Sequence, residues 1–120
     1  PPEDAEIYRP GLITVSSVTG KAFVQLQDFI ATDNVVICEP HEDYSLTTLI
    51  FMQQMIDYVN WRYSYGRQCY KTKFSKTDIY LPVDGNGDLD TKYMAELVEN
   101  TSYWSYMKKE SDFQRIKLEA

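Results

Sequence analysis

Residues 45–60, with the sequence SLTTLIFMQQMIDYVN, have the spacing of a helix with one apolar side. Apolar residues recur at intervals of three and four, which places them on one broad face of a helix with 3.6 residues per turn. They are Leu49, Met52, Met55, Ile56 and Val59. The opposite side carries Gln53, Gln54, Asp57 and Asn60. Ser45 supplies an N-cap oxygen, so we predict a helix whose apolar face packs on the core.

The residues before this helix predict three β-strands. Leu12–Ser16 and Ala22–Leu26 are rich in β-branched and apolar side chains, and a turn containing Gly20 separates them, so we predict a hairpin. Asn34–Cys38 is apolar without interruption at its centre and stops before Pro40. Such a run is typical of a strand buried on both faces, which predicts a place in the middle of a sheet.

The residues after position 77 predict a further strand and short helices. Asp78–Val83 has the composition of a strand, and its Pro82 favours an edge or an end. A polar turn follows at 84–88, and Asp90 is placed to cap a helix with apolar side chains on one side. These side chains are Met94, Leu97 and Val98. Residues 108–120 have a mixed charge and also suit a helix.

We therefore expect residues 1–120 to form one α/β (mixed α+β) domain. It has a small mixed sheet, a packed central helix and shorter C-terminal helices. No apolar run reaches the roughly 20 residues that span a bilayer, and the N-terminus does not resemble a signal peptide. A soluble, cytoplasmic protein is expected, with Cys38 and Cys69 as thiols rather than a disulfide.

Enzymatic chemistry finds little support in the residue patterns. His41 is the only histidine, and no phosphate-binding glycine motif occurs. Residues 84–90, DGNGDLD, imitate the start of a calcium-binding EF-hand loop. However, Leu89 stands where that loop needs glycine, and Ala95 stands where it needs glutamate. Glu39, Glu42 and Asp43 are explained as surface charge, so we expect no catalytic residue, metal or cofactor in this chain.

Positive charge is concentrated in residues 61–76, although the net charge of the protein is -6. The cations are Arg62, Arg67, Lys71, Lys73 and Lys76, and no acidic residue lies among them. The interleaved aromatic residues are Tyr63, Tyr65, Tyr70 and Phe74. Such a segment is typical of a nucleic-acid contact, where cations neutralise phosphates and rings meet sugars or bases. A solvated loop with its tyrosines on the core is an equal alternative from composition alone.

Several short sequence motifs, taken together in their order and spacing, resemble those of a target recognition domain of restriction–modification specificity subunits. The motifs are GLITVS at 11–16, GKAF at 20–23, DF at 28–29, YGR at 65–67 and IYLPV at 79–83. They continue with DGNGDLD at 84–90 and YM at 93–94. The resemblance implies a mixed α/β module that binds double-stranded DNA. It also implies a partner methyltransferase that uses S-adenosylmethionine, and in some systems an endonuclease subunit.

In this chain, the resemblance implies that a loop with Tyr65, Gly66 and Arg67 faces DNA. Lys71, Lys73 and Lys76 are expected to support this contact. The Ser17 to Lys21 turn, with Lys21, is expected as a second edge of the interface. Removing Arg67 is expected to relax sequence preference, since an arginine can read a guanine edge. Loss of Lys73 is expected to weaken binding to all sequences.

The chain differs from the family in two respects, and two other functions remain as alternatives. The chain lacks the long helices that space paired recognition domains and the earlier part of such a domain. It therefore fits a fragment, a half-sized subunit or a domain of a fused restriction enzyme. One rival is a protein–protein interaction module in a phage-defence or regulatory complex, which would not show salt-dependent retention on duplex DNA. The other is a stand-alone nuclease, which would need magnesium-dependent cleavage.

Overall fold

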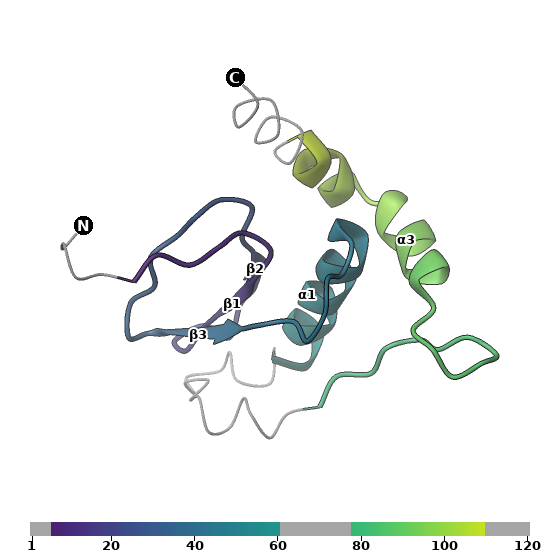
Figure 1. The fold of residues 1–120 in the computed structure, drawn as a ribbon, viewed down its shortest axis with the longest axis horizontal. Helices are drawn as coiled ribbons and strands as arrows, with labels where there is room; N and C mark the ends of the chain where they lie inside the picture. The colour runs from purple at the N-terminus through teal and green to yellow at the C-terminus, as the bar shows by residue number, and fades with distance from the viewer. Residues whose placement is uncertain (1–5, 61–77, 110–120) are drawn as a thin grey trace.

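The computed structural model describes residues 6–60 and 78–109, and these form a small sheet with helices beside it (Figure 1). The strands are β1 (Ile13–Ser16), β2 (Ala22–Val24) and β3 (Val35–Cys38). The helices are α1 (Leu46–Asn60) and α3 (Thr91–Glu99), and residues 102–109 are also helical. This arrangement confirms the predicted mixed α/β class with a central helix and shorter C-terminal helices.

The predicted hairpin is present as β1 and β2, which pair antiparallel with Ile13 opposite Val24 and Val15 opposite Ala22. The chain reverses at Gly20, whose φ of 75° lies in the left-handed region that favours glycine. The amide of Gly20 donates to the Ser16 carbonyl at 2.8 Å and closes the turn. The turn signal in the sequence therefore located the hairpin correctly.

The predicted central position of the third strand is wrong, because the strand order is β2-β1-β3 and β3 lies at the edge. Only Val36 of β3 is buried, whereas Ile13, Thr14 and Val15 of β1 are all buried. The apolar run of β3 is thus buried on one side only. Both described strand pairs are antiparallel, although the sheet was expected to be mixed.

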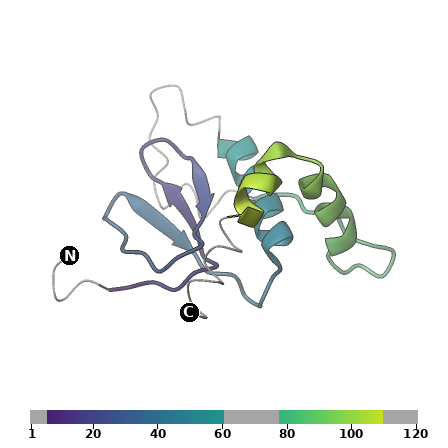
Figure 2. The same cartoon turned by 90° about the horizontal axis from the view of Figure 1, so that it is seen from above.

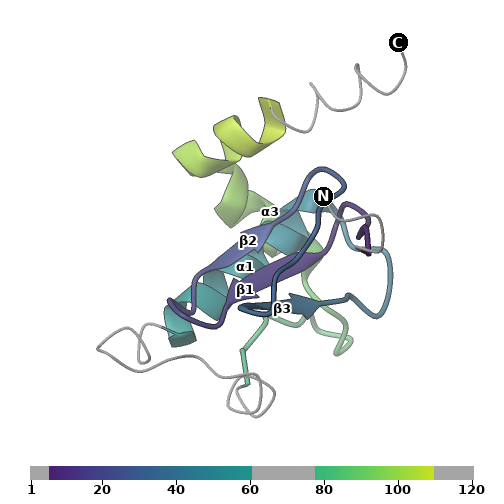
Figure 3. The same ribbon diagram turned by 90° about the vertical axis from the view of Figure 1, so that its left-hand side faces the viewer.

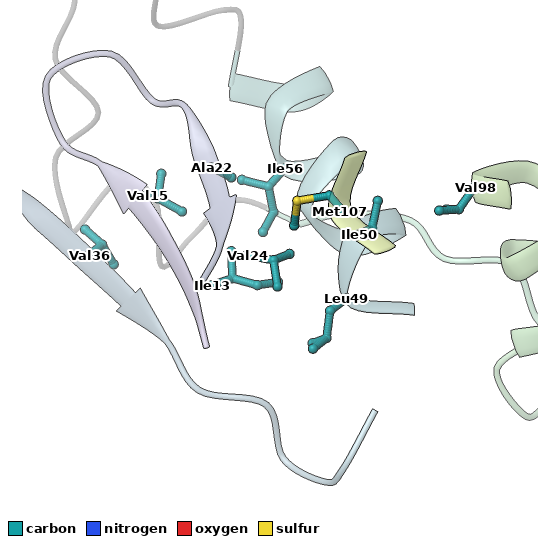
Figure 4. Close-up of a cluster of buried hydrophobic side chains, with 10 residues drawn as sticks. All are labelled: Ile13, Val15, Ala22, Val24, Val36, Leu49, Ile50, Ile56, Val98 and Met107. Carbon is teal, nitrogen blue, oxygen red and sulfur yellow. The ribbon is translucent and has the colours of Figure 1, made fainter. Parts of the chain in front are cut away.

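The core lies between one face of the sheet and the helices, which stand on one side of the strands in Figure 2. Val15, Ala22 and Ile50 are completely shielded from solvent. Figure 4 shows the side chains of the core cluster. The strands and helices contribute Ile13, Val15, Ala22, Val24, Val36, Leu49, Ile50, Ile56, Val98 and Met107.

Helix α1 begins where the sequence predicts, but its buried side differs from the predicted one. The amide of Thr48 donates to the Ser45 side-chain oxygen at 3.3 Å, which confirms the N-cap. Leu49 and Ile56 are buried as expected, together with Gln53, which was placed on the solvent side. The predicted polar side is therefore partly buried, because it faces the edge of the sheet.

Residues 78–83 do not form the predicted strand, whereas the polar turn predicted at 84–88 is present. The one strand-like pairing in this described segment is a bridge between Val83 and Leu89, and Tyr80 is 79% exposed. The Asp84 carboxylate accepts from the amides of Asn86 and Asp88, which tightens the polar turn. The Pro82 carbonyl accepts from the Asp90 amide at 2.9 Å, but Pro82 has no amide of its own to donate, and the pairing ends at this residue.

Asp90 caps α3 as predicted, since its side chain accepts from the Tyr93 amide at 3.0 Å. Met94 and Val98 are buried against the core side of the helix, as expected. Leu97 is 44% exposed, so its predicted burial is wrong. In the described part of the chain, no helix has the length and apolar character that a membrane crossing needs.

Candidate nucleic-acid interface

Six of the seven predicted DNA-facing residues lie outside the residues that the structure describes. They are Tyr65, Gly66, Arg67, Lys71, Lys73 and Lys76. Their role therefore stays a prediction. Lys21 is described, and it is exposed at the start of β2, where the hairpin turn ends.

The sheet has one face on the core and one face away from it. Side chains alternate between the two faces of a strand. Since Ile13, Val15, Ala22 and Val24 point into the core, the residues between them point the other way. We call this second surface the open face, and Figure 3 looks onto the strands with α1 behind them. Its residues are Leu12, Thr14, Ser16, Lys21, Phe23, Gln25, Val35 and Ile37, of which Leu12 and Thr14 are buried and the others are at least partly exposed.

Lys21 and Phe23 interact on the open face. The Lys21 ammonium lies 5.3 Å from the centroid of the Phe23 ring, within the range of a cation–π interaction. Phe23 itself is 45% exposed, so the ring supports the ammonium and remains accessible. The geometry holds one positive charge above an exposed aromatic surface.

Gln25 and Thr14 form the polar part of the same face. The Gln25 side-chain nitrogen donates to the Thr14 hydroxyl at 2.8 Å. Thr14 is only 6% exposed, whereas Gln25 is half-buried. The backbone of Gln25 is also fixed, because its amide donates to Leu12 and its carbonyl accepts from Gly11. The amide group of Gln25 is therefore held in place.

The hairpin turn beside this face is closed by its own side chains. The Ser16 hydroxyl accepts from the amides of Val18 and Thr19, and the Ser17 hydroxyl donates to the Asn34 carbonyl at 2.9 Å. The Lys21 amide donates to the Thr19 hydroxyl at 3.2 Å. The turn thus presents Val18 and Thr19 to solvent from a hydrogen-bonded frame.

The charge around the hairpin differs from that of the rest of the chain. No aspartate or glutamate occurs from Ile7 to Gln27, although the chain has 18 acidic residues. Asp33 and Glu39 line a cleft of about 700 Å³ beside β3, so the acidic side of the sheet is the β3 side. A polyanion would therefore meet least repulsion over β2 and the turn.

Two acidic residues approach this region: Asp28 lines a groove beside Phe23 and Gln25, and Asp57 lies at the edge of the sheet. The Asp57 carboxylate accepts from the Ala22 amide at 2.7 Å, while Gln53 accepts from the Val24 amide at 3.0 Å. Four residues of helix rise about 6 Å and two residues of strand about 6.6 Å, so the two acceptors match two successive edge amides. Helix α1 thereby occupies the β2 edge and prevents another strand from pairing there.

Burial raises the pKa of the Asp57 carboxyl above its ordinary value of 3.8, although the Ala22 bond and Lys21 partly counter this effect. The folded state therefore binds the Asp57 proton more tightly than the unfolded state does. This contribution to stability is fully present below pH 3.8 and is lost as the pH rises through the raised pKa.

We expect Asp57→Asn to be more stable than the wild type near neutral pH, because asparagine keeps the acceptor for Ala22 without a desolvated charge. The advantage should shrink on acidification and disappear below pH 3.8. Urea unfolding at several pH values measures it. Asp57→Ala is the comparison, and it should lose about 1–3 kcal/mol near neutral pH because the buried Ala22 amide loses its acceptor. Equal pH profiles of Asp57→Asn and the wild type would contradict the raised pKa.

Other polar groups do not form a second site. Within residues 6–60 and 78–109, no group of three or more histidine, cysteine or acidic side chains is placed to bind a metal ion. The Asp84 carboxylate is already used by two turn amides. Phe23, Gln25 and Thr14 were not singled out in the sequence, although alternation along the strand would have placed Lys21, Phe23 and Gln25 on one face.

Comparison with known proteins finds similarity to a specificity subunit of a restriction enzyme. The relative is S.BcgI, a specificity subunit of a type II restriction enzyme from Heyndrickxia coagulans, with 28% identity over 107 residues. The matched residues make up 87% of this chain and 30% of S.BcgI, so the chain spans about a third of that relative. No protein-family model matches the chain, and no solved structure matches it.

Proposed function

We propose that this chain is a target recognition domain of a restriction–modification specificity component, and that it binds double-stranded DNA sequence-specifically without catalysing a reaction. The observation that carries the proposal is the similarity to S.BcgI, which extends over 87% of the chain. Two of the motifs that resemble those of recognition domains, GLITVS and GKAF, lie in β1, the turn and β2. That the resembling motifs and the candidate interface share this segment supports the proposal.

The charge distribution supports DNA as the ligand. A net charge of -6 opposes binding to a polyanion, so contact requires a local surface without acidic residues. The two longest stretches without an acidic residue are the 21 residues from Ile7 to Gln27 and residues 58–77, which contain the basic segment 61–76. In this proposal, Arg67 and its lysine neighbours contact DNA from the basic segment, and Lys21 contacts a phosphate from the hairpin.

The proposal also assigns the chemistry to partners. A methyltransferase subunit binds S-adenosylmethionine and modifies a base, and an endonuclease subunit cuts where one is present. The complex acts in the cytoplasm, as part of phage defence. The recognition domain supplies the contacts that choose the site, so it requires no metal or cofactor of its own.

Binding to a duplex at several salt concentrations tests the proposal. Each lysine that neutralises a phosphate releases counterions, so log K should fall linearly with log salt concentration. We expect Lys21→Ala and Lys73→Ala each to weaken binding to all sequences and to reduce the magnitude of this slope by about 1.

Lys92→Ala is the matched control, since Lys92 is exposed on α3 and lies outside both acid-free segments. It should leave the slope unchanged. Salt-independent retention, or no retention on duplex DNA at all, would overturn the proposal and favour a protein-interaction module instead.

A further inference from the structure

The open face carries three side chains in a row along one strand. Lys21, Phe23 and Gln25 occupy alternate positions, so they project on the same side, and they span roughly 13 Å at 3.3 Å per residue. At about 3.4 Å per base step, this row matches about four steps of B-DNA. The major groove admits β-strands, and sheet proteins use strands to read bases there.

The hydrogen-bonding state of Gln25 limits what it can read. A glutamine amide has two N–H donors and one oxygen acceptor. One donor is used by Thr14 at 2.8 Å, which leaves one donor and one acceptor on the same amide. Adenine presents an N7 acceptor and an N6 donor in the major groove, and glutamine binds this pair bidentately. The groups that Thr14 leaves available are therefore the two that adenine requires.

We propose that Gln25 reads an adenine in the major groove, with Thr14 holding its amide and Phe23 contacting the methyl group of a neighbouring thymine. The inference rests on the proposed function, because it requires that the open face meets duplex DNA. Thr14 acts as a positioning residue, since it is 6% exposed and bonds to Gln25. Lys21, held over the Phe23 ring at 5.3 Å, contacts a phosphate beside these bases.

Both base-reading side chains are accessible from solvent. Phe23 is 45% exposed and Gln25 is half-buried. A groove of about 400 Å³ at the outer edge of β2 reaches both residues and is also lined by Asp28 and Tyr103. The hydrogen bonds that hold this segment in the hairpin are made by the backbone, through Gly11 and Leu12. Replacing the Gln25 side chain therefore removes the reading group and leaves the hairpin pairing in place.

Selection from a pool of random duplexes with the full chain tests the inference. The wild type should prefer an A·T pair at one position of its site. Gln25→Ala should lose that preference by roughly 5- to 150-fold, the discrimination of one bidentate contact, and keep the preferences at other positions. Thr14→Val should weaken the same preference, and Thr14→Ser, which keeps the hydroxyl, should restore it.

Gln25→Glu gives a readout that does not depend on loss of binding. A carboxylate has only acceptors, which suits the cytosine N4 donor, so the preference at this position should change from adenine to cytosine. Gln54→Ala, on α1, is the matched control and should leave the profile unchanged.

The possible outcomes distinguish a failure of the proposed DNA-binding function from a failure of the inference about Gln25. No duplex binding by the wild type would overturn the proposed function itself. Sequence-specific binding with the same profile in Gln25→Ala would overturn only the inference, and so would a uniform loss across all sequences. Circular dichroism and urea unfolding of each variant confirm that the compared proteins are folded.

Discussion

We expect Ile50→Ala to lower the free energy of unfolding by about 2–5 kcal/mol. Ile50 lies in α1, has no solvent-exposed surface, and belongs to the cluster between the sheet and the helices. Truncation removes buried methyl groups and leaves a cavity, because a close-packed interior relaxes only in part. Urea unfolding followed by circular dichroism measures the change at the transition midpoint, with an unchanged denaturant slope.

Ile7→Ala is the control, since it makes the same chemical change at a side chain that is 66% exposed. Its effect should stay within about 0.5 kcal/mol. Ile50→Val should cost less than Ile50→Ala, about 0.5–1.5 kcal/mol, because fewer methyl groups are lost. Equal losses for Ile7→Ala and Ile50→Ala would show that α1 does not pack as described.

Local signals in the sequence were sufficient for the hairpin and for the starts of both helices. Ser45 and Asp90 each cap a helix with an oxygen that accepts an amide proton three residues further on. Gly20 supplies the positive φ that the turn needs. These features depend on neighbouring residues only, so propensity and spacing are enough to predict them.

Features that depend on distant residues were predicted less well. The order β2-β1-β3 places β3 at the edge, because pairing partners are chosen across the fold and an apolar run does not reveal them. Gln53 and Asp57 were placed on a solvent face, yet both bind amides of β2. The prediction from helical spacing assumes that polar side chains hydrogen-bond to water. Here the amides at the unpaired edge of β2 take the place of water as hydrogen-bond donors.

The candidate site shows the same division. Composition pointed to the basic segment 61–76, and the resemblance added Lys21; of these predicted residues, the described part of the chain includes only Lys21. The contribution of Gln25 depends on its bond to Thr14, which lies 11 positions away in the chain. The accessible surface of Phe23 likewise depends on which strand occupies the sheet edge. The sequence therefore indicated where charge gathers, and the fold adds which polar groups are positioned beside it.

We expect Gln53→Ala to lower the free energy of unfolding by about 2–4 kcal/mol. Gln53 is 5% exposed, and its side chain links β2 to the C-terminal helical residues 102–109. It accepts from the Val24 amide at 3.0 Å and bonds to the Tyr103 hydroxyl at 3.1 Å. Truncation leaves the buried Val24 amide without an acceptor, which costs more than a solvent-exposed hydrogen bond would.

Two comparisons separate this role from simple loss of side-chain volume. Gln54→Ala changes the adjacent glutamine, for which the described residues give no hydrogen bond, and its effect should stay within about 0.5 kcal/mol. Tyr103→Phe removes only the hydroxyl partner and should cost about 0.5–1.5 kcal/mol. Hydrogen exchange at the Val24 amide gives the local readout. This amide lies at the outer edge of β2, and among the described residues its hydrogen-bond acceptor is Gln53. Exchange at Val24 that is equally slow in Gln53→Ala and in the wild type would refute the proposed bond between α1 and the sheet edge.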